Sequence, residues 1–266
     1  MTNNAEHSHY NWPLILAYHS VNDRRTDPLA VRASDFEQQM AWLYRQGFKA
    51  ITISQFVSEP TNKGNRVVML TFDDGYADNY TSAFPILRRY GFVATVFLVS
   101  DFIDTDRLHW WDITNVTSDD DRPLYQMLTW QQIREMEAHG FEFGSHTRTH
   151  PLLTSLIGDR GWGEISGSRS MLESKLGHQV LSFCYPHGDM NEEIMQLVEK
   201  AGYECAVITP PRHGIPLCRY TLRRIGIYHS TTPLRFRLKM NPIVRRNYER
   251  LKWRPFRRHS TVGVAR

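Results

Sequence analysis

Short apolar runs alternate with amphipathic segments along most of the chain. Each run is four to six residues long and is bounded by polar or turn-forming residues, as is typical of strands buried on both faces of a sheet. The predicted strands are 14–18, 48–51, 67–72, 94–99, 141–144, 180–185, 205–208 and 224–228. The predicted helices are 34–46, 79–90, 129–140, 163–176 and 191–201.

This alternation favours an α/β fold with a mostly parallel sheet or barrel. We expect a single domain over residues 13–232, preceded by an extension at 1–12 and followed by a basic tail at 233–266. Segment 109–122 interrupts the pattern because it is polar, irregular and rich in tryptophan. We expect it to form one wall of a cleft.

Two segments match the capping box, in which a Ser or Thr at the N-cap is followed three residues later by Glu or Gln. Ser34 with Glu37 and Thr129 with Gln132 have this spacing, so each pair predicts the start of a helix. Ser54 is expected to start a further short helix.

The composition indicates a folded protein with a large core, since 41% of its 266 residues are hydrophobic. The sequence has three cysteines, Cys184, Cys205 and Cys218. Their number is odd and no two of them form a CxxC pair, which favours reduced thiols over a disulfide framework. The apolar run near the N-terminus is too short for a signal peptide, and no segment reaches the length of a membrane span. The sequence therefore predicts a cytoplasmic protein.

The net charge of +4 conceals an uneven distribution of charged residues. Residues 235–266 contain eleven Lys or Arg and one acid, Glu249, which leaves 21 basic and 27 acidic residues in 1–234. Basic residues interleaved with aromatic ones suit an anionic membrane surface or nucleic acid, and the acidic body disfavours nucleic acid. The tail thus predicts peripheral association with the inner membrane face; the alternative is a helix that packs its apolar side on the barrel.

Charged and imidazole side chains recur just after the predicted strands. His19, Asp73 with Asp74, His146, His187 and His229 all occupy such positions. In a β/α barrel the carboxyl ends of the strands gather at one face. We therefore expect these side chains to form one site, although an Asp-Asp-Gly turn could also simply end a strand.

His146 and His150 are four residues apart, a spacing that on a helical turn would direct both imidazoles toward one ion. With Asp74 they would form a two-histidine, one-carboxylate set that leaves coordination positions open. Zinc, cobalt, nickel or ferrous iron would suit these donors, whereas calcium and magnesium prefer more oxygen ligands. The neighbouring carboxylate would remain free to act as a base. A histidine pair on a solvated loop is the alternative.

Three segments together resemble the polysaccharide deacetylases of the NodB-homology group, carbohydrate esterase family 4. They are 71–75 (Thr-Phe-Asp-Asp-Gly), 146–150 (His-Thr-Arg-Thr-His) and 183–188 (Phe-Cys-Tyr-Pro-His-Gly). The resemblance spans about residues 13–230 and implies a distorted (β/α) barrel. It also implies that Asp73 is the general base, that Asp74 binds the metal and that the backbone N–H of His187 helps to bind the oxyanion.

The sequence departs from this family in two ways that affect the site. Cys184 stands where many members carry an Arg that orients the base, so Arg223 or Arg224 is the candidate to replace it. The histidine that protonates the leaving amine is His229 if it comes late in the chain. In a circularly permuted branch of the family, which resembles poly-N-acetylglucosamine deacetylases, this histidine comes first in the chain and would be His19. We favour His19.

The resemblance implies a metal-dependent hydrolase, with Zn²⁺ as the expected metal, that removes N-acetyl groups from an amino-sugar polysaccharide, oligosaccharide or glycolipid precursor. A deformylase or other amide hydrolase on the same scaffold and a non-catalytic carbohydrate-binding homologue are the alternatives. Trp110, Trp111 and Trp162 are candidates for stacking against the sugar or, equally, for the core. The oligomeric state is left open.

Overall fold

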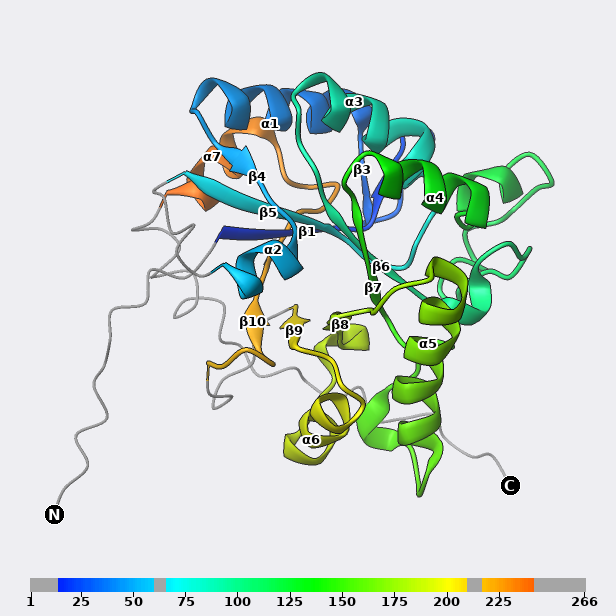
Figure 1. Ribbon diagram of the computed structural model, residues 1–266. Helices are drawn as coiled ribbons and strands as arrows, with labels where there is room; N and C mark the ends of the chain where they lie inside the picture. The colour runs from blue at the N-terminus through cyan, green and yellow to red at the C-terminus, as the bar shows by residue number, and fades with distance from the viewer. Residues whose placement is uncertain (1–13, 60–65, 210–216, 242–266) are drawn as a thin grey trace, which may run out of the picture.

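The computed structural model describes residues 14–59, 66–209 and 217–241. The predicted extension at 1–12 and most of the predicted basic tail lie outside these residues. The predicted α/β fold is confirmed within them, because a parallel sheet curls into a nearly closed barrel with helices on its outer side (Figure 1).

Every strand of the barrel pairs in parallel with its neighbours. Within the described residues the order is β10-β9-β8-β7-β6-β5-β1-β11, and β4 also pairs with β5. The bounds are β1 Leu14–Tyr18, β4 Lys49–Ala50, β5 Val67–Phe72, β6 Thr95–Leu98, β7 Glu142–Ser145, β8 Ser182–Cys184, β9 Cys205–Ile208, β10 Leu222–Arg223 and β11 Ile225–Gly226. A separate pair joins β2 Ser20–Val21 to β3 Ala30–Val31.

The barrel closes at a single segment, residues 222–226. β10 pairs with β9, and β11, which begins two residues after β10 ends, pairs with β1 at the other edge of the sheet. The strand predicted at 224–228 is therefore wrong in its bounds, because the chain changes partner at Arg224. This residue is thereby fixed at the point where the two edges meet.

Most of the helices connect successive strands and cover the outside of the barrel (Figure 1). They are α1 Ala33–Arg45, α2 Ile53–Ser58, α3 Phe84–Arg89, α4 Trp130–Ala138, α5 Arg160–Leu176, α6 Glu192–Lys200 and α7 Pro233–Met240. A π-helical turn, Asn79–Ala83, precedes α3. Short 3-10 turns occur at Ser100–Phe102, Arg122–Tyr125, Leu153–Ser155 and Pro186–Gly188.

The capping box at Thr129 is confirmed, whereas the one at Ser34 is wrong. Thr129 and Gln132 exchange both hydrogen bonds at the start of α4. In contrast, α1 already begins at Ala33, whose N–H donates to the Asp23 carboxylate, 3.0 Å away. Since Asp23 satisfies this end of the helix from another segment, Ser34 is not needed as a cap.

The start predicted for α2 at Ser54 is also wrong. Thr52 caps this helix and forms a capping box with Gln55. The hydroxyl and N–H of Ser54 instead donate to Glu142 at the start of β7. The helix is thereby held against the amino end of the strands.

The apolar strands are buried on both faces, which explains why they are continuous runs. In β1, Leu14, Leu16 and Tyr18 belong to the large cluster beneath the helices, whereas Ile15 belongs to the barrel interior. The other buried members of the interior cluster are Ile53, Met69, Phe97, Cys184, Cys205, Val207 and Leu222. All three cysteines are free thiols, as predicted.

The first part of the basic tail is helix α7, which packs on the barrel through α1. Phe236 and Met240 are buried, and the Phe236 ring lies edge-on to Trp42 at 6.0 Å. Arg235 and Arg237 remain exposed. For residues 233–240 the structure therefore agrees with the alternative prediction for the tail, a helix that packs its apolar side on the barrel. Among the described helices, none is long and apolar enough to cross a membrane.

Candidate metal centre and active site

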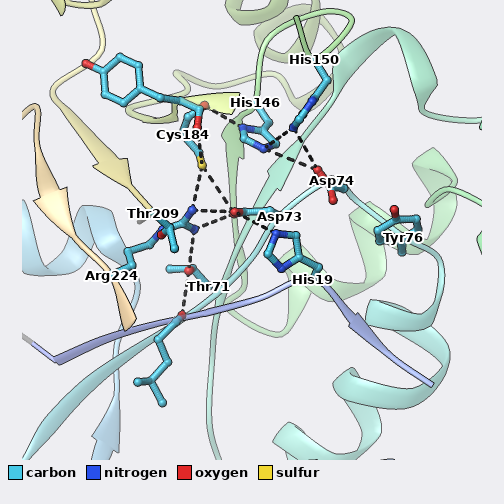
Figure 2. A network of polar contacts seen from close by, with 12 residues as sticks. His19, Thr71, Asp73, Asp74, Tyr76, His146, His150, Cys184, Thr209 and Arg224 are labelled. Carbon is cyan, nitrogen blue, oxygen red and sulfur yellow. Dashed lines mark hydrogen bonds and ion pairs between the residues drawn. The ribbon is translucent and has the colours of Figure 1, made fainter. Parts of the chain in front are cut away.

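The predicted convergence at the carboxyl ends of the strands is confirmed for most of the candidate residues. His19 follows β1, Asp73 and Asp74 follow β5, and His146 follows β7. They lie together in Figure 2, although they are up to 127 residues apart in sequence. The parallel register of β1, β5, β6 and β7 brings these strand ends to one edge of the sheet.

Asp74, His146 and His150 form a buried cluster that matches the predicted metal site. The Asp74 Oδ1 atom lies 3.6 Å from His146 Nε2 and 3.4 Å from His150 Nε2. The two Nε2 atoms are 3.1 Å apart. One ligand atom from each of the three residues therefore lies within 4.8 Å of the others.

A loop, not a helical turn, brings the two histidines together, so the helical interpretation of their spacing is wrong. Thr147 and His150 have φ values of +68° and +62° in the left-handed region, which no α-helix contains. The loop is held by Glu164 of α5, whose carboxylate accepts from the N–H groups of Arg148 and Thr149 at 2.9 Å. Strained backbone of this kind is concentrated at functional sites.

The donors of this cluster fit a divalent cation. His146 Nδ1 lies 2.7 Å from the Cys184 carbonyl oxygen, and a hydrogen bond there leaves Nε2 with a free lone pair that faces Asp74. Burial lowers the pKa of His146 to about 4 and that of His150 well below its ordinary value, so both rings are neutral. Burial and the neighbouring Asp73 carboxylate raise the pKa of Asp74. A bound cation would compensate this buried charge, and the donor set suits a transition metal.

Asp73 has different partners from Asp74, although the two are adjacent in sequence. Arg224 donates from Nη1 to Oδ1 and from Nη2 to Oδ2 of Asp73, both at 2.6 Å. Burial alone would raise the pKa of Asp73, but the charge and hydrogen bonds of Arg224 hold it well below its usual range. Asp73 is therefore a carboxylate at neutral pH and can accept a proton.

Arg224 orients Asp73 in the way that the missing Arg at position 184 was expected to do. Its Nη2 lies 3.1 Å from the Cys184 sulfur, and its Nε donates to the Thr209 hydroxyl at 2.8 Å. Of the two predicted candidates, Arg223 and Arg224, the second thus contacts the carboxylate. Cys184 is therefore in contact with the guanidinium that takes the place of the expected Arg.

The two candidate proton donors lie in different surroundings. His19 lines the cavity at the site, and its Nε2 is 3.9 Å from Asp73 Oδ2. Burial lowers the pKa of His19 to about 4, although the Asp73 carboxylate acts in the opposite direction. His229 is not among the described residues that line this cavity, and its Nδ1 lies 3.1 Å from the Ala30 carbonyl oxygen. The geometry therefore favours His19.

The third motif contributes His187 to the cavity wall. Its φ is +55°, and its ring packs edge-to-face on His150 at 4.6 Å between centroids. Burial lowers the pKa of His187. This residue therefore lies beside the metal candidate, as the sequence predicted.

The predicted irregular segment, 109–122, does form one wall of the cavity, which has a volume of about 450 Å³. Trp110, Trp111 and Asn115 line it. Trp162 does not, among the described residues, because it lies on α5, where the Lys200 ammonium is 5.1 Å from its ring.

A buried polar network behind Trp111 was not predicted from the sequence. The Trp111 Nε1–H donates to the Tyr76 hydroxyl at 3.2 Å, and this hydroxyl donates to Asp112 at 2.6 Å. Arg25, 1% exposed, reaches Asp112 at 3.4 Å and lies between the rings of Tyr76 and Tyr125 at 4.4 and 4.2 Å. In the sequence, the feature that could have indicated this network is Asp112, the acid that directly follows the two tryptophans.

Comparison with known proteins agrees with the family that the sequence resembles. The family model described as "Polysaccharide deacetylase" matches residues 61–206, more than half of the chain. YxkH of Bacillus subtilis, which is named for the polysaccharide deacetylases, is 32% identical over 200 residues, 74% of this chain and 64% of that protein. The poly-β-1,6-N-acetyl-D-glucosamine N-deacetylase of Escherichia coli K12 is 33% identical over 147 residues, 51% of this chain and 21% of that protein.

A solved structure is similar over nearly its whole length. The deacetylase PplD of Streptococcus pyogenes, in complex with acetate, superposes with a TM-score of 0.71 at 26% identity and covers 86% of this chain and 98% of that one. The chain belongs to the polysaccharide deacetylase family. It spans less than two thirds of the length of the two curated relatives described above.

Proposed function

We propose that this protein is a metal-dependent hydrolase that removes N-acetyl groups from an amino-sugar-containing glycan. The observation that carries the proposal is the division of labour between two adjacent carboxylates. Asp74 faces His146 and His150, whereas Asp73 is held in its charged form by Arg224. A metal ligand and a proton acceptor thus lie side by side at one cavity.

Asp74, His146 and His150 would hold the cation, for which we propose Zn²⁺. A divalent cation held there would supply Lewis acidity for the N-acyl carbonyl and would lower the pKa of water. Asp73 accepts the proton of the attacking water, since Arg224 keeps its carboxylate ionised and fixes its orientation. The backbone N–H of His187 helps to stabilise the oxyanion that forms on the carbonyl oxygen when water attacks the acyl carbon.

The leaving nitrogen needs a proton, and His19 is proposed to deliver it. Because burial lowers its pKa, His19 is neutral at the start of the reaction. The proton that Asp73 accepts from water can pass to His19 once substrate binding shortens the 3.9 Å between His19 Nε2 and Asp73 Oδ2 to hydrogen-bond distance. His19 then protonates the amine as the C–N bond breaks. Acetate and a free amino sugar are the products, and Asp73 is again ionised.

The relatives support N-acetylglucosamine as the sugar. The Escherichia coli relative is named for a β-1,6-linked polymer of this sugar, and the PplD structure contains acetate, the expected product. We propose a glycan of the same chemical class as substrate here. The cytoplasmic location and the association of the basic tail with a membrane stay predictions.

An assay of acetate and formate release tests the proposed function directly. Purified, Zn²⁺-loaded protein is incubated with N-acetylated and N-formylated glucosamine oligosaccharides, and a chelator-treated sample serves as the control. Acetate release that disappears with the chelator is expected. Release of formate alone would identify a deformylase, and sugar binding without release of either acid would identify a carbohydrate-binding homologue.

A further inference from the structure

Arg25 is a buried cation in the segment between β2 and β3. It is 1% exposed and is not among the described residues that line the cavity. Its Nε donates to the Asp27 carboxylate at 2.8 Å, and its Nη2 lies 3.4 Å from Asp112 Oδ1. Its Nη1 has no hydrogen-bond partner among the described residues. A buried guanidinium costs free energy unless its donors are satisfied, so one with an unsatisfied nitrogen needs an explanation.

The two carboxylates that Arg25 contacts belong to two different walls of the cavity. Asp27 itself lines the cavity, at the start of the wall formed before β3. Asp112 directly follows Trp111, which lines the cavity from segment 109–122. One rigid guanidinium therefore connects two walls that come from distant parts of the sequence.

The guanidinium is also held between two aromatic rings. Its central carbon lies 4.4 Å from the ring centroid of Tyr76 and 4.2 Å from that of Tyr125. Contact with both rings fixes the orientation of the planar group. The adjacent Arg24 differs, because it is exposed and donates to the Asp120 carbonyl oxygen of the same segment at 3.3 Å. Arg25 is thus a rigid connection between the walls, whereas Arg24 is a solvated one.

Trp111 lies between this network and the proposed metal ligand His150. Its indole N–H donates to the Tyr76 hydroxyl at 3.2 Å, and that hydroxyl donates to Asp112 at 2.6 Å. Its ring lies edge-on to His150, with centroids 4.8 Å apart. Without Arg25, Asp112 would be a buried carboxylate with no counter-charge, and it would no longer hold the Tyr76 hydroxyl in place. The position of Trp111 in the wall therefore depends on Arg25.

We propose that Arg25 is a positioning residue that sets the separation of the two cavity walls. Its kinetic consequence rests on the proposed function, but the arrangement itself can be measured without turnover. A stabilising role alone explains the network less well, because apolar residues in place of a buried ion pair often leave stability unchanged or raise it. Asp27 and Trp111 face the substrate, whereas the base and the metal ligands have other partners. Loss of Arg25 should therefore affect KM more than kcat.

The kinetic test compares Arg25→Met with the adjacent control Arg24→Met. Initial rates of acetate release are measured with an N-acetylated glucosamine oligosaccharide, and zinc content is measured in parallel. We expect Arg25→Met to raise KM about tenfold, with kcat within about threefold of wild type and zinc content unchanged. Arg24→Met should behave as wild type. If the wild-type protein releases acetate and Arg25→Met has an unchanged KM, the proposal is refuted.

The double variant Arg25→Met, Asp112→Asn separates positioning from stability. It removes the unpaired charge of Asp112, so its free energy of unfolding should exceed that of Arg25→Met. Its KM should stay raised, because the two walls remain unconnected. A KM that returns to the wild-type value together with the stability would show a structural role only. This variant also provides the test if Arg25→Met does not fold.

Hydrogen exchange at the Trp111 indole separates this inference from the proposed function. The N–H signal is followed by NMR of the full-length protein labelled with ¹⁵N and is assigned with Trp111→Phe. We expect exchange with water to be at least about tenfold faster in Arg25→Met than in wild type or Arg24→Met. That result supports the positioning role even if no form releases acetate. Exchange as slow as in wild type would overturn the proposal whether or not the protein is a deacetylase.

Discussion

Replacing Arg224 with Met should reveal how the fold keeps Asp73 charged. Both residues are buried, at 3% and 4% exposure, and two hydrogen bonds of 2.6 Å join them. Methionine is apolar and leaves the Asp73 carboxylate without a counter-charge. Breaking a buried ion pair from one side costs about 3–5 kcal/mol. We therefore expect the free energy of unfolding to fall by about this amount at neutral pH.

The effect of pH on this loss follows from the pKa of Asp73. In the wild-type protein Arg224 outweighs burial and holds this pKa below its unfolded value of about 3.9. The resulting stability is fully present above that value and is lost as the pH falls through the lower folded pKa. In Arg224→Met no guanidinium opposes the effect of burial, so the pKa of Asp73 rises above its unfolded value. Stability then falls as the pH increases from the unfolded pKa toward this raised pKa. The difference between the two proteins should therefore be larger at neutral pH than in mild acid.

Urea unfolding in mild acid and at neutral pH measures both effects. Arg89→Met is the control, because Arg89 pairs with Glu37 on the surface and should cost less than about 1 kcal/mol. The double variant Asp73→Asn, Arg224→Met should recover part of the loss, since no buried charge remains. If Arg224→Met were as stable as wild type, or if its loss did not shrink in mild acid, the account of Asp73 would be wrong.

Three further predictions concern the proton donor, the barrel and the tail. His19→Ala should lower kcat for acetate release at least about 100-fold, while His229→Ala stays near wild type; the reverse result would identify His229 as the donor. Gly144→Ala should destabilise the barrel by about 1–3 kcal/mol or more in urea unfolding, because its Cβ would lie 2.5 Å from Ser182 Oγ and 2.6 Å from the Phe97 ring. A chain truncated after Asn241 keeps α7 on the barrel and should lose salt-sensitive flotation with anionic liposomes; undiminished flotation would exclude the tail as the anchor.

The sequence was sufficient to predict the barrel and most members of the site. Apolar runs that end in Asp73, Asp74 or His146 identify parallel strands, and the fold then gathers their carboxyl ends. The residue types alone left a simple turn open, and the recurrence of such residues at several strand ends, together with the family resemblance, favoured a metal site. These signals are local, so they are visible without any knowledge of distant contacts.

The features that could not be predicted depend on contacts between distant segments. The sequence left Arg223 and Arg224 as alternative partners of Asp73, and the choice depends on the change of strand partner from β9 to β1 at Arg224. His146 and His150 meet through left-handed backbone at Thr147, which no spacing rule reveals. Asp23 replaces the cap expected from Ser34 for the same reason: a tertiary hydrogen bond supersedes a local one.

The central claim is that Asp74 holds a metal while its neighbour Asp73 acts as a base. The most direct measurement is elemental analysis and acetate release on the matched pair Asp73→Asn and Asp74→Asn, both checked for folding by circular dichroism. The account predicts that Asp73→Asn retains its zinc but releases no acetate, and that Asp74→Asn loses both. Zinc retained by Asp74→Asn, or normal acetate release by Asp73→Asn, would contradict it.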